Sequence, residues 1–486
     1  MEAAQKKSFK DYFNLFREAI QGKEQEFTTG SIDKAIFLLA VPMILEMAME
    51  SLFAVVDAYF VSTLGKYAIA TVGLTELVLT LVYTIAIGIS MSVTAYVARR
   101  TGEKDHDSAA HAAVNTIYIG VGISLLITLA GIFFPSEILY AMGAEPEAVR
   151  IGTPYIRIML LGNIVIMLLF LVNGIFRGAG NAAIAMRSLW IANGINIVLC
   201  PSLIMGLGPL PEMELTGAAV ATTIGRGSGV IYQIYHLVKG SRLLPVMKKH
   251  LQVNWLIISR ILKTSIGGTL QFFIASCSWI FLGRIVAEFH SEAVSGHTIA
   301  MRIIIFAILP AWGMANAAAT LVGQNLGANQ PERAETSVWR AGFRNLIFLG
   351  LISITFTALA PQIIGIFTTD PSIAKYGIQS LRYIAVGYVF YAYGMVIPSA
   401  FNGAGDTITP TLLNFFGFWC FQIPLAYFLS FQWNMGPTGV FLAIPIAETA
   451  IAIAGIVLFR QGKWSGSKYD CFIGLIFCKI AVEPST

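Results

Sequence analysis

Long apolar stretches recur along this chain from end to end, and they constrain its fold more than any other feature. A run of about 20 predominantly apolar residues is long enough to cross a bilayer as a helix. Only 12% of the 486 residues are charged, against about 25% in soluble domains, so the charged surface is too small for a soluble protein. We therefore predict an all-α integral membrane protein with twelve transmembrane helices, at 34–64, 69–98, 111–134, 149–174, 184–207, 216–239, 256–289, 293–323, 337–360, 377–400, 408–431 and 438–459.

Lysine and arginine residues gather in alternate connections between these helices. The segment before the first helix and the connection after the sixth are rich in them, and Arg177 and Arg187 flank the connection after the fourth. The third and fifth connections carry acidic residues instead. Because basic connections stay on the cytoplasmic side, we expect a multi-pass protein of the cytoplasmic (inner) membrane with both termini in the cytoplasm.

The chain weakly resembles itself when it is shifted by about half its length, the separation expected for a duplicated unit. Residues 176–181 (Phe-Arg-Gly-Ala-Gly-Asn) then fall on residues 401–406 (Phe-Asn-Gly-Ala-Gly-Asp), and Pro146 falls on Pro371. Each half has six predicted helices, an even number, so the two halves share one orientation. Transporters built from such parallel repeats bind their substrate between the halves.

The predicted organisation follows from this repeat and from the distribution of charge. Two parallel six-helix repeats form the bulk of the chain, with polar segments before, between and after them. The parts are a cytoplasmic amphipathic N-terminal segment (1–30), an N-lobe with helices 1–6 (31–238), a cytoplasmic linker (239–255), a C-lobe with helices 7–12 (256–460) and a cytoplasmic C-terminal tail (461–486).

Three carboxylates lie within the first predicted helix, where each costs roughly 2.5–3.5 kcal/mol at the bilayer centre. They are Glu46, Glu50 and Asp57. Their spacing places them within roughly 40° of one another around a helix of about 100° per residue. This acidic stripe predicts a site that binds H⁺ or Na⁺, or attracts a cationic solute. The alternative is an ion pair inside the bundle, with Arg226 of the sixth helix as the candidate partner.

The second half lacks this stripe, since its counterpart of Glu46 is Gln271. It offers polar, aromatic and methionine side chains that could line a substrate cavity: Gln271, Tyr388, Tyr391 and Met301. Flat aromatic cations suit such a lining through cation–π contact. The alternative is that these side chains face lipid or the protein core.

No motif for a metal, a nucleotide or catalysis stands out. The five cysteines are scattered without a CxxC pair, so we expect no metal site. The Gly-Ala-Gly sequences at 178–180 and 403–405 lack the Gly-Lys-Ser/Thr ending of a phosphate loop. With the histidines dispersed along the sequence, we expect a transporter driven by an ion gradient, not an enzyme, with no cofactor besides the transported H⁺ or Na⁺.

Several stretches resemble the multidrug and toxic compound extrusion (MATE) family. They are Leu39-Ala-Val-Pro42 with Asp57 after it, Gly178-Ala-Gly-Asn181, Asn196-Ile-Val-Leu199 and Leu321-Val-Gly-Gln-Asn-Leu-Gly327. The resemblance implies two lobes around a V-shaped cavity and efflux of organic cations coupled to H⁺ or Na⁺. It also implies that Asp57 and Asn196 belong to the cation-coupling site, and that bending at Pro42 gates the first lobe.

The chain also departs from the family. The residue after the Asn-Ile-x-Leu sequence is often Asp in the family but is Cys200 here, and Glu46 and Glu50 are unusual. We hypothesise that Glu46 or Glu50 supplies the negative charge missing at Cys200. The runner-up function is a flippase for lipids or lipid-linked oligosaccharides of the same superfamily, which would need a strongly basic cavity. Expected partners are small organic cations, H⁺ or Na⁺ and the lipid bilayer, with no nucleic acid, and a monomer would suffice.

Overall fold

The computed structural model describes residues 9–22 and 25–466, so most of the predicted C-terminal tail (461–486) lies outside the described residues. The described part is helical throughout and contains no strand. Its α-helices are α1 (Phe9–Gln21), α2 (Ile32–Ser62), α3 (Lys66–Gly102), α4 (His106–Phe133), α5 (Pro135–Ala141), α6 (Pro146–Leu161), α7 (Asn163–Gly178), α8 (Ala182–Met205), α9 (Glu214–Lys239), α10 (Trp255–Ala287), α11 (Ser291–Gly327), α12 (Pro331–Gly365), α13 (Pro371–Val386), α14 (Tyr388–Ala404), α15 (Ile408–Asn414), α16 (Ile423–Tyr427) and α17 (Pro437–Arg460). Short 3₁₀ or π segments are η1 (Lys248–Leu251), η2 (Phe415–Gln422), η3 (Phe428–Gln432) and η4 (Lys463–Gly466).

Twelve membrane spans can be assigned to these helices. Among the described residues, ten helical stretches are long and apolar enough to cross a membrane, and the pair α13–α14, bent by 56°, makes an eleventh. The twelfth is α9, whose 26 residues extend about 39 Å but include polar residues such as Arg226 and Gln233. The predicted all-α membrane fold with twelve helices in two lobes is confirmed.

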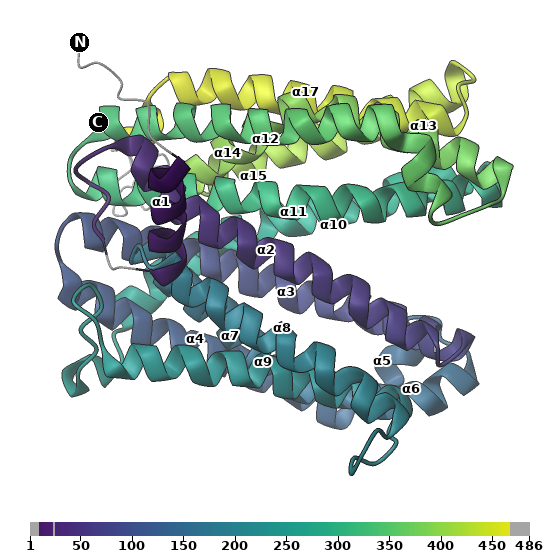
Figure 1. The fold of residues 1–486 in the computed structure, drawn as a ribbon, viewed down its shortest axis with the longest axis horizontal. Helices are drawn as coiled ribbons and strands as arrows, with labels where there is room; N and C mark the ends of the chain where they lie inside the picture. Colours follow the sequence, from purple (N-terminus) through teal and green to yellow (C-terminus); the bar gives the residue numbers. More distant parts are fainter. Residues whose placement is uncertain (1–8, 23–24, 467–486) are drawn as a thin grey trace, which may run out of the picture.

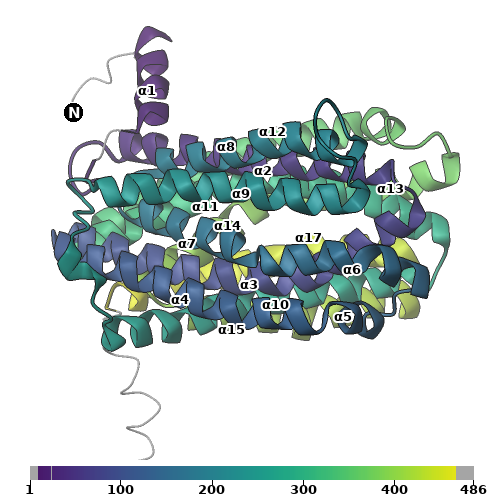
Figure 2. The same ribbon diagram turned by 90° about the horizontal axis from the view of Figure 1, so that it is seen from below.

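The helices run along one common direction and form two groups, which are the two lobes (Figure 1). Helices α4 to α9 pack with α3 around one hydrophobic core. Helices α11 to α14 and α17 pack around another. Helix α1 runs across the other helices at one end of the molecule, the end at which α17 also finishes (Figures 1 and 2).

The first helix of each half crosses into the core of the other half. Ile36, Leu39 and Met43 of α2 belong to the hydrophobic core of the C-lobe, and Ile257 and Ile261 of α10 belong to that of the N-lobe. Hydrophobic packing therefore crosses the boundaries that the sequence predicts at residues 31 and 256. The two lobes are held together along the half of the bundle that carries α1.

Glycines make this crossing possible. A Cβ atom on Gly313 of α11 would lie 2.6 Å from the backbone of Met43 and Ile44 in α2. A Cβ atom on Gly268 of α10 would lie 3.1 Å from the Cα atom of Gly88 in α3. Real Cβ atoms do not approach a backbone at the first of these distances, so the close contact between α2 and α11 requires a residue without a side chain.

At the same end, one side chain of α11 bridges the segment before α2 and the end of α7. The Gln324 side chain of α11 donates a hydrogen bond to the carbonyl of Gly178, after α7, and accepts one from the N–H of Phe27, both at 3.1 Å. Arg333 of α12 donates to the carbonyls of Phe27, Thr29 and Gly30. We call residues 25–31 the strap, because Arg333 fixes them to α12 and Gln324 of α11 bridges them to the end of α7.

Candidate functional site

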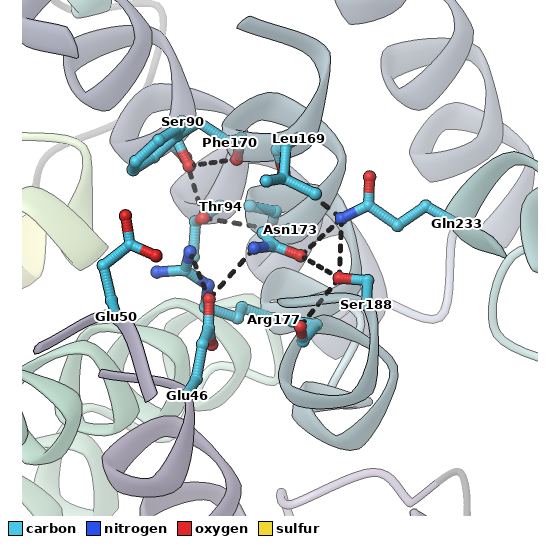
Figure 3. A network of polar contacts seen from close by, with 12 residues as sticks. Glu46, Glu50, Ser90, Thr94, Leu169, Phe170, Asn173, Arg177, Ser188 and Gln233 are labelled. Atoms are coloured by element: carbon cyan, nitrogen blue, oxygen red, sulfur yellow. Dashed lines mark hydrogen bonds and ion pairs between the residues drawn. The ribbon is translucent and has the colours of Figure 1, made fainter. Parts of the chain in front are cut away.

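The three acids of α2 face three different helices of the N-lobe. Glu46 lies deepest, with 1% of the residue exposed. Its Oε1 atom accepts hydrogen bonds from Asn173 Nδ2 at 3.0 Å and from Arg177 Nη2 at 3.2 Å (Figure 3). Asn173 and Arg177 are one helical turn apart on α7, so both side chains reach the same carboxylate.

A buried polar network continues from this ion pair into α8 and α9 (Figure 3). Asn173 Oδ1 accepts hydrogen bonds from Ser188 at 3.1 Å and from Gln233 at 2.5 Å. Gln233 also donates to Ser188 and to the carbonyl of Leu169. Since an unpaired buried charge is strongly unfavourable, this network fixes the position of Glu46 relative to α7.

Glu50 lies one turn further along α2 and pairs with the candidate partner named from the sequence. Its Oε1 atom is 2.9 Å from Arg226 Nη2, and its Oε2 atom accepts a hydrogen bond from Asn193 at 3.1 Å. The Arg226 guanidinium also lies over the rings of Phe53 and Tyr83, 5.3 and 5.8 Å from their centroids. The two ring faces and the Glu50 carboxylate together stabilise the positive charge of Arg226 inside the bundle.

Asp57 lies near Cys200, the residue at which the chain departs from the family. The Cys200 thiol is 3.7 Å from Asp57 Oδ1. Neither Glu46 nor Glu50 is a neighbour of Cys200, because both are taken up by arginines further along α2. Asp57 is therefore the carboxylate in contact with Cys200, and the hypothesis that Glu46 or Glu50 supplies the charge missing at Cys200 stays a prediction.

Asn196 is one helical turn before Cys200 on α8 and is 2% exposed. Its side chain donates to Thr222 of α9 at 3.0 Å, and its Oδ1 atom has no hydrogen-bond partner. It lies on the same helix as the neighbour of Asp57, but among the described contacts it is bonded to α9 and not to Asp57. An unpaired buried carbonyl oxygen is a free ligand for a cation or a water molecule.

A central cavity lies between the two lobes. Side chains of both lobes line it: Met47, Ile87, Ser90, Met91, Thr94, Ala95, Phe170 and Arg177 from the first half, and Phe272, Trp312, Asn316, Ala319, Ser399 and Asn402 with Gly403 from the second. Arg177 is the charged side chain in this lining, and its partner Glu46 sits behind it. Arg177, which the sequence places at the flank of the connection after the fourth helix, is 8% exposed and belongs to the wall of the cavity.

The four side chains predicted to form a substrate cavity in the second half do not lie together. Gln271 is 4% exposed and exchanges hydrogen bonds with Asn402 at 3.0 Å in both directions. Tyr388 and Tyr391 line a separate pocket inside the C-lobe. Met301 packs against the C-lobe core. None of the four belongs to the lining of the central cavity.

Pro42 sits within α2, next to the crossing with α11. The helix continues through it from Ile32 to Ser62. Its ring removes one backbone donor from the helix, and the backbone of the following two residues is where Gly313 of α11 makes its close approach. A change of bend at Pro42 would therefore move the outer half of α2, with its acids, relative to the contact with α11.

The histidines are less dispersed in space than in the sequence. His250 of η1 lies 2.8 Å from Asp107, and its ring meets that of His111 at 4.7 Å. The N–H of Met247 donates a hydrogen bond to His250 Nδ1 at 3.0 Å. A neutral His250 therefore carries its proton on Nε2, and this N–H donates a hydrogen bond to Asp107. Lys249 contacts Asp107 as well. These contacts attach the linker, through His250, to Asp107 and His111 of α4. They leave His250 without a free lone pair for a metal.

Sequence reasoning missed the partners that surround the three acids. Asn173, Ser188, Asn193 and Gln233 are uncharged, and nothing in their local sequence points to α2. The available signal was that polar side chains inside a membrane bundle are unfavourable unless they are bonded. Each is buried in the bundle and bonded to an acid of α2 or to another member of the network.

Comparisons with known proteins agree with this geometry. The MatE family model matches residues 42–202 and 269–428, more than half of the chain. The probable multidrug resistance protein NorM of Thermotoga maritima is 24% identical over 452 residues, which cover 93% of this chain and 96% of NorM. The multidrug export protein MepA of Staphylococcus aureus is 23% identical over 440 residues, covering 89% and 94%. A solved outward-facing multidrug resistance MATE family transporter superimposes with a TM-score of 0.86 at 28% identity, covering 91% of this chain and 98% of that one.

Proposed function

The chain belongs to the MatE family of multidrug transporters, and we propose that it exports organic cations in exchange for H⁺ or Na⁺. It is a multi-pass membrane protein of a transporter family. The proposal adds the coupling ion, the class of substrate and the residues that link the two. It also places the protein in the cytoplasmic membrane as a self-sufficient monomer with cytoplasmic termini.

One observation carries the proposal: the coupling acids lie on the helix that belongs to both lobes. Glu46, Glu50 and Asp57 bind helices of the N-lobe, whereas Ile36, Leu39 and Met43 of the same helix pack in the C-lobe core. A proton or Na⁺ that binds at an acid changes the attraction between α2 and the N-lobe. Because the other half of α2 is held by the C-lobe, that change can alter the arrangement of the lobes, as alternating access requires.

Asp57 is the acid best suited to bind the ion. Glu46 and Glu50 each have an arginine as counter-charge, whereas the direct partner of Asp57 is the thiol of Cys200. An unneutralised carboxylate inside a bundle needs a cation or a proton. The free Oδ1 atom of Asn196 offers a second oxygen on the same helix as Cys200. In this scheme, ion binding changes the bend of α2 at Pro42, and the change of bend moves α2 relative to its contact with α11.

The central cavity supports an aromatic cation as the substrate. Phe170, Phe272 and Trp312 provide ring faces, and Met47 and Met91 provide adaptable apolar contact. The flippase alternative would need a strongly basic wall for a pyrophosphate group. Arg177 is the basic residue in this lining, and Glu46 neutralises it. The composition of the cavity therefore favours the export of organic cations.

Ethidium efflux from proteoliposomes tests the proposal. Vesicles carry an imposed pH gradient, an imposed Na⁺ gradient or neither, and wild type is compared with Asp57→Asn. The control is Asp370→Asn, because Asp370 caps α13 and Asn caps a helix about as well. We expect efflux with one of the two gradients, its loss in Asp57→Asn and no change in Asp370→Asn. Efflux that is equal with and without gradients would overturn the coupling.

A further inference from the structure

The C-lobe contains a buried carboxylate that the proposed transport scheme does not use. Glu448 lies in the middle of α17 and is 7% exposed. Its counterpart in the repeat is Arg226, which has Glu50 as a partner. Among the described residues, Glu448 has no ion pair and no hydrogen bond, and Arg302 and His297 of α11 do not pair with it. His297 is held by Ser380 at 2.9 Å and stacks on Phe441 instead.

Glu448 lines a pocket that shares no lining residue with the central cavity. Five helices, α10, α11, α13, α14 and α17, contribute to it, and its lining consists of Trp279, Ile304, Ile308, Ile384, Gly387, Tyr388, Tyr391, Ile444 and Pro445 together with Glu448. Glu448 is the charged residue of this lining. Tyr388 is 2% exposed, and its hydroxyl has no hydrogen-bond partner. Two polar groups thus share one apolar pocket without a partner from the described chain.

The chemistry of this pocket selects among possible occupants. A Na⁺ ion needs several oxygen ligands to replace its water shell, but the side chains around Glu448 offer only the hydroxyl oxygens of Tyr388 and Tyr391. Trp279 adds an indole N–H, which donates and cannot bind a cation, and the other lining side chains are hydrocarbon. An ionised carboxylate without a partner is strongly unfavourable there. A neutral carboxylic acid needs only one or two hydrogen bonds, which tyrosine hydroxyls or a water molecule can supply. The pocket therefore suits a protonated Glu448 better than an ionised Glu448 with a bound Na⁺.

The pocket also lies at the one sharp bend of the C-lobe. Helices α13 and α14 meet at Gly387 with a bend of 56°, and a Cβ atom on Gly387 would lie 2.6 Å from the Cβ atom of Pro445. Glu448 follows Pro445 by about one turn of α17. A change of charge at Glu448 would thus act where α17 packs against the bend.

We propose that Glu448 is a second proton-binding site, in the C-lobe, which loads and releases one proton in each transport cycle. This inference rests on the proposed antiport. It predicts that two ions are exchanged per substrate, one at Asp57 in the N-lobe and one at Glu448. No residue of the second half was assigned this role from the sequence.

The stoichiometry can be measured from the steady-state substrate ratio across proteoliposomes. The membrane potential is clamped at zero, Na⁺ is equal on both sides, and the pH difference is one unit. Each exchanged proton then contributes a factor of about ten to the ratio, since one pH unit corresponds to about 1.4 kcal/mol. With two protons we expect about a 100-fold ratio in wild type and about tenfold in Glu448→Gln. Glu288→Gln is the control, because Glu288 is an exposed C-lobe acid paired with Arg284, and it should match wild type.

The outcomes separate this inference from the function on which it rests. Equal ratios in wild type and Glu448→Gln would overturn the second site while leaving antiport intact. A wild type that concentrates no substrate under any gradient would overturn the antiport itself.

A second measurement needs no variant. Infrared spectra of wild type with ¹³C-labelled glutamate should show a protonated glutamate carbonyl band at neutral pH, because Glu46, the other buried glutamate among the described residues, is ion-paired. The absence of that band across the pH range of transport would contradict the inference even if Glu448→Gln failed to fold.

Discussion

The ion pair between Glu46 and Arg177 joins α2 to the wall of the central cavity. Both residues are buried, and Arg177 Nε has no hydrogen-bond partner. Removing one member of a buried pair leaves the other charge without compensation, which costs about 3–5 kcal/mol. Removing both leaves no charge behind, so the two losses should not add.

This non-additivity can be measured by thermal unfolding in detergent. We expect Glu46→Gln and Arg177→Met each to lower the unfolding free energy by about 3–5 kcal/mol, and the double variant to lose clearly less than the sum. Glu147→Gln is the control, because it breaks an exposed ion pair with Arg150 and should cost less than about 1 kcal/mol. If Glu46→Gln costs no more than Glu147→Gln, the pair does not hold α2 in place.

For single residues, the sequence singled out the acids of α2 but predicted only one of their contacts. The acids of α2 stood out because a carboxylate in an apolar helix is rare, and the candidate partner Arg226 is indeed 2.9 Å from Glu50. The partners of Glu46 and Asp57 could not be predicted, because Arg177 and Cys200 lie on helices more than a hundred residues away in sequence. Their proximity depends on how whole helices pack.

Among the elements, α2 and α10 decide how the lobes meet. Their predicted ranges, 34–64 and 256–289, exceed the about 20 residues that cross a bilayer, and the structure shows that each helix reaches into the opposite core. Hydrophobicity gives the position of a span, but it does not tell which of two apolar cores receives it. The close approach of Gly313 to α2 is likewise invisible in the sequence, where Gly313 is one glycine among 45.

A larger side chain at Gly313 should increase the distance between the two lobes at the end of the molecule where α1 lies. Spin labels on exposed positions Lys104 and Asn329, in the turns after α3 and α11, report the distance between the lobes. We expect Gly313→Val to lengthen this distance and to lower transport, because its Cβ atom would clash with the backbone of α2 at 2.6 Å. Gly350→Val on α12 is the control, since nothing lies within 4 Å of a Cβ atom there. An unchanged distance in Gly313→Val would show that the crossing tolerates bulk.

The contacts of the strap can be tested with a variant that removes hydrogen bonds and introduces no steric clash. Gln324→Ala removes two hydrogen bonds that join the strap to the turn after α7, each worth about 1 kcal/mol. We expect the same spin-label pair to show a larger population of long distances, with unfolding temperature nearly unchanged. Thr298→Ala, which loses a hydrogen bond within α11, serves as the control. A distribution identical to wild type would mean that the strap does not help to hold this end closed.

For the whole molecule, the internal repeat explains both the similarity and the difference of the two lobes. Each lobe is built from six spans, so their orientation and the location of the cavity between them follow from the sequence. The chemistry is not duplicated, because the first half carries three acids on α2 whereas the second half has Gln271 in the corresponding helix and Glu448 on its last. Coupling therefore has to be argued from individual residues, and the proposed antiport assigns it to α2, the helix shared by both lobes.

The exchange of substrate for an ion is the claim on which this account depends, and ion movement driven by substrate alone tests it most directly. Proteoliposomes with equal pH and equal Na⁺ on both sides receive an ethidium gradient, while dyes in the lumen report H⁺ and Na⁺. We predict that ethidium moving down its gradient drives H⁺ or Na⁺ in the opposite direction, and that Asp57→Asn abolishes this ion movement. Ethidium flux through the wild type without any opposing ion movement would contradict the account.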